Sequence, residues 1–156
     1  MREGIGLYKA KRVDNGKWVE GNLVLSNDAQ DDFKAIIIPQ TNNGIFTKHT
    51  GFKNISCYLG FEEWYKVDES TLCQWTGLVD KNGVKVFEGD IVESVFNKRK
   101  YIMCYGDFTY ENEYGDIQDV YGWYNEDEDG FSTPFGCPEK WAIVICNIHD
   151  EKAVEE

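Results

Sequence analysis

The sequence lacks any apolar run of membrane-spanning length, and its first residues lack the apolar stretch of a signal peptide. We therefore expect a protein that remains in the cytoplasm of the cell that makes it. Cysteine is also sparse: there are five, an odd number, without the tight spacing of a disulfide framework. In a reducing cytoplasm such cysteines are expected to be buried as small apolar side chains.

Helical periodicity is missing too, because no segment longer than about ten residues repeats apolar side chains at helical spacing. The chain instead alternates short β-rich runs with Gly, Asn and Asp, and its 15% aromatic content supplies a core. The sequence therefore predicts a mainly β, hairpin-rich fold, partly open-barrel in form, with few short helical turns. We expect two small β subdomains: residues 1–66, and a barrel-like part over 67–156 with an insert at 106–140. A single compact domain is the alternative.

Recognisable catalytic motifs are absent as well. The sequence contains no glycine-rich phosphate-binding loop, and its histidines are His49 and His149 alone. Cys146 and His149 are the only close pair of potential zinc ligands, but residues three apart on a strand point to opposite faces. We therefore predict no catalytic, cofactor-binding or metal-binding residues.

Basic residues are missing from one long stretch, since no Lys or Arg occurs from Tyr101 to Glu139. Its acidic residues are Asp107, Glu111, Glu113, Asp116, Asp119, Glu126, Asp127, Glu128 and Asp129. The whole chain has a net charge of -12, which repels nucleic-acid phosphates and membrane headgroups, so we expect it to bind neither directly. The acidic stretch is either a solvated surface or a possible partner surface that meets a basic protein or imitates DNA.

Two hairpins are predicted by their turn residues. Asn15-Gly16 separates strands over 8–13 and 18–25, and Asp80 to Gly83 separates the two halves of 76–87. The two segments share a pattern, Val-Asp before the turn and Gly followed by Asn or Asp after it. Shared turn chemistry is the favoured explanation, and an internal duplication is the alternative.

Further strands are expected over 33–39, 45–47, 53–59, 62–67, 91–96 and 101–105. Residues 68–71 are expected to form one helical turn that Asp68 caps. The last strand, 141–148, is too apolar to lie at a hydrated edge. The tail over 150–156 is charged and is expected to be helical or frayed.

The run from Gln74 to Val92, with TGL, NG and EGDIV, resembles the central signature of the YopX family of bacteriophage and prophage proteins. Segments 8–21 and 146–150 resemble the family's opening and closing motifs. The resemblance implies a mainly β fold in two subdomains and a homo-oligomer, and it implies no catalytic residues. We expect structural roles for Thr76, Gly77, Leu78, Asp80, Asn82, Gly83, Glu88, Gly89 and Asp90.

Three functions remain open at this point. The favoured one is a non-catalytic accessory module that self-associates and binds a host or phage protein in the cytoplasm of an infected or lysogenic bacterium. The second is an acidic decoy that occupies a host DNA-binding protein. The third is a metal-dependent hydrolase, which would need three or more convergent carboxylates or histidines.

Overall fold

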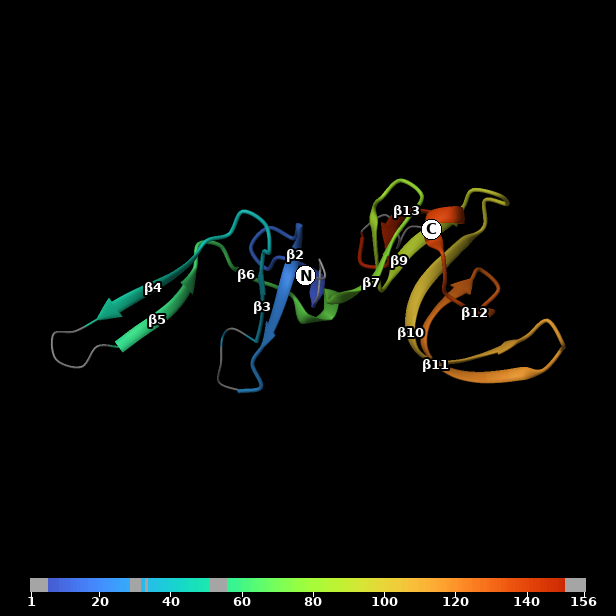
Figure 1. Ribbon diagram of the computed structural model, residues 1–156, viewed down its shortest axis with the longest axis horizontal. Helices are drawn as coiled ribbons and strands as arrows, with labels where there is room; N and C mark the ends of the chain where they lie inside the picture. The colour runs from blue at the N-terminus through green and yellow to red at the C-terminus, as the bar shows by residue number, and fades with distance from the viewer. Residues whose placement is uncertain (1–5, 29–31, 33, 51–55, 151–156) are drawn as a thin grey trace. The chain divides into compact units, whose positions relative to one another are not determined.

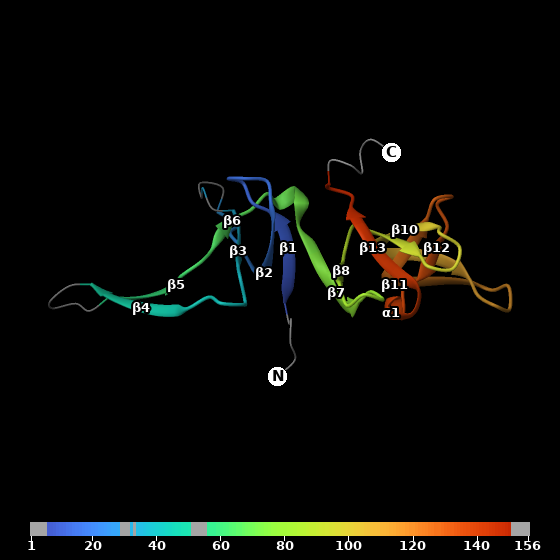
Figure 2. The same ribbon diagram turned by 90° about the horizontal axis from the view of Figure 1, so that it is seen from above.

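A computed structural model describes residues 6–28, 32, 34–50 and 56–150 of the chain. The expected mainly β fold is confirmed, because strands dominate these residues and the helical parts are one 3₁₀ turn and one four-residue helix. Neither of these two described helices is long enough to cross a membrane. The chain forms two compact units, Met1–Leu72 and Cys73–Glu156 (Figures 1 and 2).

The main sheet of the first unit is antiparallel, with strands in the order β6-β3-β2-β1. Its strands are β1 (Leu7–Lys11), β2 (Trp18–Leu25), β3 (Ala35–Ile38) and β6 (Tyr65–Lys66). The hairpin predicted between β1 and β2 is confirmed, and its turn uses a left-handed Gly16 at φ 69°. Ala10, Ala35, Ile37 and Val67 form the core of this unit.

Gly21 in β2 allows a close approach that no other residue type would permit. A Cβ atom at this position would overlap the backbone carbonyl of Ile38, which lies on the neighbouring strand β3. The glycine is therefore required by the packing of two strands rather than by a turn.

A separate hairpin in the first unit consists of β4 (Ile45–Thr50) and β5 (Ser56–Phe61), which extend away from β2 and β3 in both views (Figures 1 and 2). The amide of Asn43 ties its base. Asn43 Nδ2 donates to the carbonyl oxygens of Pro39 (3.0 Å) and Glu63 (2.8 Å), and Asn43 Oδ1 accepts from the Glu63 amide (2.7 Å). One side chain thus fixes where the hairpin leaves the rest of the unit.

The predicted helical turn is confirmed as η1 (Glu69–Thr71). The Asp68 side chain accepts from the Ser70 amide at 3.0 Å, which is the expected capping bond. The expectations for Phe33, for residues 53–55 and for the tail beyond Asp150 lie outside the described residues.

The second unit contains the β7–β8 hairpin and an antiparallel sheet in the order β12-β11-β10-β9-β13. Its elements are β7 (Cys73–Val79), β8 (Lys85–Phe87), β9 (Asp90–Ser94), β10 (Lys100–Glu111), β11 (Ile117–Asp127), β12 (Ser132–Pro134), α1 (Pro138–Trp141) and β13 (Ala142–Asn147). Val86, Val92, Met103 and Ala142 form its core. Among the described strands the sheets stay open rather than closing into a barrel.

Strand β13 is the last strand of its sheet, although its apolar sequence predicted a position away from water. The turn of the β7–β8 hairpin covers its outer edge. Val144 N donates to Asp80 Oδ2 at 2.9 Å, and Lys81 N donates to Ala142 O at 3.0 Å. These bonds occupy backbone groups that an edge strand would otherwise offer to another chain.

Candidate functional site: the signature turns and the acidic hairpin

Asp80, the central acid of the signature, is buried at the turn between β7 and β8, with 2% of its surface exposed. Its Oδ1 accepts from the amides of Asn82 (2.8 Å) and Val84 (2.9 Å), and its Oδ2 accepts from Val144 as described above. A buried carboxylate is tolerated when several N–H groups replace its hydration. Asp80 therefore closes the turn and fastens it to β13.

Asp90 is fully buried at the bend that follows Gly89. Its Oδ2 accepts from the Phe87 amide at 2.8 Å, and its Oδ1 accepts from Asn147 Nδ2 at 2.9 Å. Gly89 has φ 78°, a left-handed conformation that favours glycine. This bend is thus the second point at which the signature is tied to β13.

The other signature residues lie around these two ties. Thr76 Oγ1 donates to Val86 O at 2.7 Å, and Gly77 and Gly83 have φ values of 87° and 81°. Leu78 and Asn82 are exposed, and Glu88 is half-buried. The polar bonds of the signature run between backbone and side chains of the same unit, so they serve the fold.

The acidic stretch is a long hairpin of β10 and β11, paired from Tyr101↔Asp127 to Glu111↔Ile117, and the two strands curve together (Figure 1). Gly106 lies directly opposite Gly122 at its middle. On the face of this glycine pair, the rings of Phe108 and Tyr124 stack with centroids 4.7 Å apart. Gly106 has φ 148°, a backbone conformation that side chains rarely adopt, and glycines within strands are typical of bent sheets.

The nine acidic residues of the stretch do not form one row. Side chains alternate between the faces of a strand, so the register places Asp107, Glu111, Asp119 and Asp127 on one face and Glu126 on the other. Glu113 and Asp116 lie in the turn between the strands, and Glu128 and Asp129 lie in the turn after β11. The acids therefore lie on two faces of the hairpin and in two turns.

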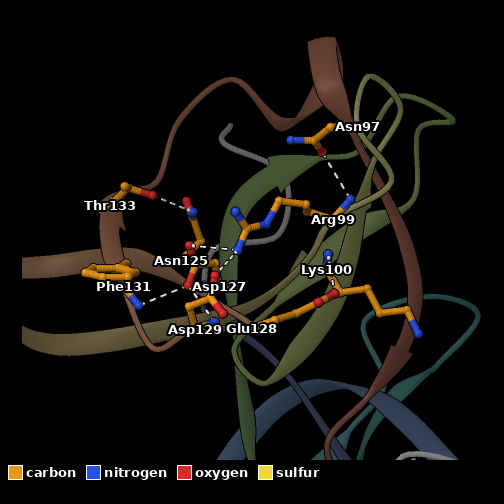
Figure 3. A network of polar contacts seen from close by, with 9 residues as sticks. All are labelled: Asn97, Arg99, Lys100, Asn125, Asp127, Glu128, Asp129, Phe131 and Thr133. Carbon is orange, nitrogen blue, oxygen red and sulfur yellow. Dashed lines mark hydrogen bonds and ion pairs between the residues drawn. The ribbon is translucent and has the colours of Figure 1, made fainter.

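Three of these acids bond to residues at the base of the hairpin: two pair with the Arg99 guanidinium, and one accepts from a backbone amide (Figure 3). Arg99 Nη2 lies 2.7 Å from Asp129 Oδ2 and 3.4 Å from Asp127 Oδ2. The hydrogen bond with Asp129, together with the charge of Asp127, raises the pKa of the Arg99 guanidinium. Glu128 Oε1 accepts from the Lys100 amide at 3.2 Å.

Asp127 also shapes the turn itself, since its Oδ1 accepts from the amides of Asp129 (2.9 Å) and Phe131 (3.0 Å) (Figure 3). Nearby, Asn125 Nδ2 donates to Thr133 Oγ1 at 2.6 Å, which holds β12 against β11. The acids at this end of the hairpin therefore bond within the hairpin and its turn, and Glu128 and Asp129 remain exposed.

The family model described as YopX protein matches residues 7–153 of the chain, nearly its whole length. The chain belongs to the YopX family. The match confirms the resemblance that the signature indicated. No curated protein matches the chain, and no solved structure does.

The middle of the hairpin differs from its base in this YopX-family chain. Asp107 and Asp119 are exposed, and neither forms an ion pair or side-chain hydrogen bond with the described residues. On the same face lie Tyr105, Tyr121 and Trp123, with Tyr105 centred 5.4 Å from Tyr121 and 4.8 Å from Trp123. Sequence reasoning singled out the acids and missed these rings, although the alternation of Tyr121 and Trp123 is typical of side chains on one strand face.

Metal and cysteine chemistry find little support in the described part of the YopX-family chain. No group of three or more His, Cys, Asp or Glu side chains converges there in a way that could hold a metal ion. Cys73 is buried as expected, whereas Cys104 and Cys146 are half-buried and Cys137 is exposed, contrary to expectation. Burial raises the pKa of the Cys104 thiol, which makes it a weaker nucleophile. The side chain of Cys57 lies outside the described set.

Proposed function

We propose that this YopX-family chain is a non-catalytic accessory module that self-associates through its β4–β5 hairpin. In this proposal it works in the cytoplasm of a phage-infected or lysogenic bacterium and binds a host or phage protein. The observation that supports self-association is the exposure of apolar side chains on both faces of a two-stranded hairpin.

The two faces follow from the register of β4 and β5. Ile45 pairs with Phe61, so these side chains share a face with Leu59; Ile45 is 67% exposed and Leu59 is 65% exposed. Phe46 lies on the other face, and its ring covers Gly60, whose added Cβ would come within 2.6 Å of it. A hairpin with both faces exposed to solvent is expected to have polar side chains at these positions.

Apolar surface continues from the hairpin to its base. A groove of about 370 Å³ there is lined by Ile36, Leu59, Gly60, Phe61 and Trp64, and Trp64 is itself exposed. Contiguous exposed apolar surface of this kind is typical of protein interaction sites. The groove gives a partner chain a place to insert an apolar side chain.

A second copy of the chain is the occupant that fits this surface. An isolated two-stranded hairpin is marginally stable in water, and β4 and β5 pair only with each other among the described strands. Antiparallel addition of the same hairpin about a two-fold axis would pair an open edge with itself. Packing of the apolar faces of the two copies against each other would in addition cover Ile45, Leu59 and Phe61, whose side chains project out of the plane of the hairpin.

The test is the oligomeric state in solution, measured by size-exclusion chromatography with light scattering over a concentration series. The double variant Ile45→Glu and Leu59→Glu should be a monomer, while the wild-type chain and Val13→Glu should remain oligomeric. Val13 is the matched control because it is also exposed and apolar but lies in the β1–β2 turn. A monomeric wild-type chain at every concentration would refute self-association.

A further inference from the structure

We infer that the middle of the β10–β11 hairpin binds an arginine-bearing, extended segment of another protein. The surface that carries this inference, here called the aromatic face, consists of Tyr105, Asp107, Asp119, Tyr121 and Trp123. It lies in the second unit and does not include the β4–β5 hairpin, so it goes beyond the proposed self-association.

The register brings the members of the aromatic face together. Tyr105 pairs with Trp123, Asp107 pairs with Tyr121, and Asp119 pairs with Thr109, the next position on that face. Directly paired residues of an antiparallel ladder project from the same side of the sheet. The aromatic face thus places two carboxylates beside three rings, of which Tyr105 contacts the other two.

The rings of the aromatic face are more exposed than structural support requires. Tyr105 is 45% exposed and Tyr121 is 66% exposed. The bend of the hairpin is supported from the other face, where Phe108 is buried against Tyr124. Exposed aromatic rings that the local packing does not use are typical of binding surfaces, in which Tyr and Trp supply most of the affinity.

Charge determines the kind of partner. Asp107 and Asp119 make no ion pair with the described residues, and the sequence has no Lys or Arg between Tyr101 and Glu139. A guanidinium group can stack on an aromatic ring and at the same time donate two hydrogen bonds to a carboxylate. Nucleic acid could also stack on the rings, but a net charge of -12 opposes it.

The spacing favours an extended segment rather than a single small cation. Residues on one side of a strand are about 6.8 Å apart, so arginines at alternate positions of an extended peptide would repeat like the rings and acids of the hairpin. Asp107, Asp119 and Tyr121 of the aromatic face also line an open hollow of about 680 Å³, together with Thr109 of the same face, Phe108 and Val120 of the opposite face, and Ser132. This hollow gives such a segment room to lie along the strands.

The probe is a hexapeptide of alternating arginine and serine, titrated into the full chain by calorimetry at physiological ionic strength. A peptide with citrulline in place of arginine keeps the shape and removes the charge. We expect the arginine peptide to bind and the citrulline peptide to bind at least about tenfold more weakly. Absence of binding at millimolar arginine peptide, or equal binding of both peptides, would overturn the inference.

Variants localise the binding. Tyr121→Ala, and separately the pair Asp107→Asn and Asp119→Asn, should each weaken it about tenfold. The controls are Phe131→Ala, an exposed ring outside the face, and the pair Glu113→Gln and Glu139→Gln, exposed acids with the same charge change. Equal losses in the controls would indicate general charge attraction and overturn the inference.

Two further arms separate this inference from its alternatives. Duplex DNA should neither bind nor compete with the arginine peptide, and DNA binding that Tyr121→Ala abolishes would reassign the face. The variant Ile45→Glu with Leu59→Glu should bind the peptide with unchanged affinity. Peptide binding can therefore fail while self-association holds, and the reverse can also occur.

Discussion

The β1–β2 and β7–β8 hairpins have similar turn residues, but these residues make different contacts in the two hairpins. In the first, Asp14 is exposed, and its Oδ1 accepts from Arg12 Nε at 2.9 Å. In the second, the corresponding Asp80 is buried and accepts three backbone amides, one of them 64 residues away in β13. The aspartate at this turn position therefore makes only a local contact in the first unit, whereas in the second unit it connects the turn to strand β13.

The glycines that follow each turn differ in the same way. Gly21 is needed because the Ile38 carbonyl lies against it, whereas Gly89 is needed for its left-handed backbone. Asn22 after the first is exposed, whereas Asp90 after the second is buried. The two hairpins thus share turn residues, and the residues packed around each turn determine what each shared residue contributes.

The largest difference between the hairpins should appear when the two aspartates are removed. Asp80→Ala would leave the amides of Asn82, Val84 and Val144 without their acceptor. We expect it to lower the free energy of unfolding by about 3–5 kcal/mol. Asp14→Ala should produce no resolvable change. Urea denaturation followed by tryptophan fluorescence measures both, and equal effects would contradict the comparison.

The next effect tests the close approach at Gly21. Gly21→Ala forces a methyl group against the backbone of β3, which cannot move aside as a side chain could. We expect a loss of about 3 kcal/mol. Gly16→Ala is the control, since it has open space and only its positive φ is unfavourable, at about 1 kcal/mol. A smaller loss at Gly21 than at Gly16 in thermal denaturation would refute the packing role.

Asp90→Asn should have a smaller effect because it preserves shape. The amide would place a donor against either the Phe87 amide or Asn147 Nδ2, both of which now donate to Asp90. We expect a loss of about 2 kcal/mol, and Asn22→Ala should stay within about 0.5 kcal/mol. The midpoints of denaturant unfolding give both values, provided that the dependence of the unfolding free energy on denaturant concentration stays constant. An unchanged midpoint for Asp90→Asn would show that the buried hydrogen bonds of Asp90 do not stabilise the fold.

The smallest effect concerns the exposed pair of the first hairpin. Hydrogen bonding to Arg12 lowers the pKa of the Asp14 carboxyl. A lowered pKa in the folded state means that the pair stabilises at pH values above the unfolded pKa and that this contribution is lost as the pH falls through the folded pKa. Because Asp14 is exposed and water screens the charges, the ion pair contributes little to the free energy of unfolding.

Arg12→Ala should accordingly return the Asp14 pKa toward its ordinary value in a carbon-detected NMR titration. Lys17→Ala, which removes a charge from the same turn without touching the carboxylate, is the control. An Asp14 pKa that does not rise in Arg12→Ala would show that the pair does not form in solution.

Local turn chemistry made the hairpins predictable from sequence, because Asn15-Gly16 and Asp80 to Gly83 determine their own backbone conformations. The length of β10 was not predictable in this way. Its expected end near Tyr105 reflected the glycine and acids that follow, yet the strand continues to Glu111 because Gly106 meets Gly122 across the hairpin. Such pairing depends on register, which no single segment contains.

The acidic surface was predictable in composition but not in arrangement. The absence of Lys and Arg from 101–139 suggested charge without compensation, but Arg99, just outside the stretch, pairs with Asp127 and Asp129. The rings of the aromatic face share a surface only because β10 and β11 align Tyr105 with Trp123. Local sequence patterns indicated where acidic and aromatic residues are concentrated. Long-range strand pairing determined which of these side chains are exposed on one surface and which are paired within the fold.

The bond from Asp80 to Val144 also has a consequence for how the chain is made. Non-local contacts slow folding because a long loop must close before they form. On the ribosome, the bond from Asp80 to Val144 cannot form until β13 has emerged, whereas the bonds within the β7–β8 turn can form before that. The first unit is released much earlier, and domains commonly fold in that order. Until β13 is available, the Asp80 carboxylate in the nascent chain therefore has two of its three amide donors.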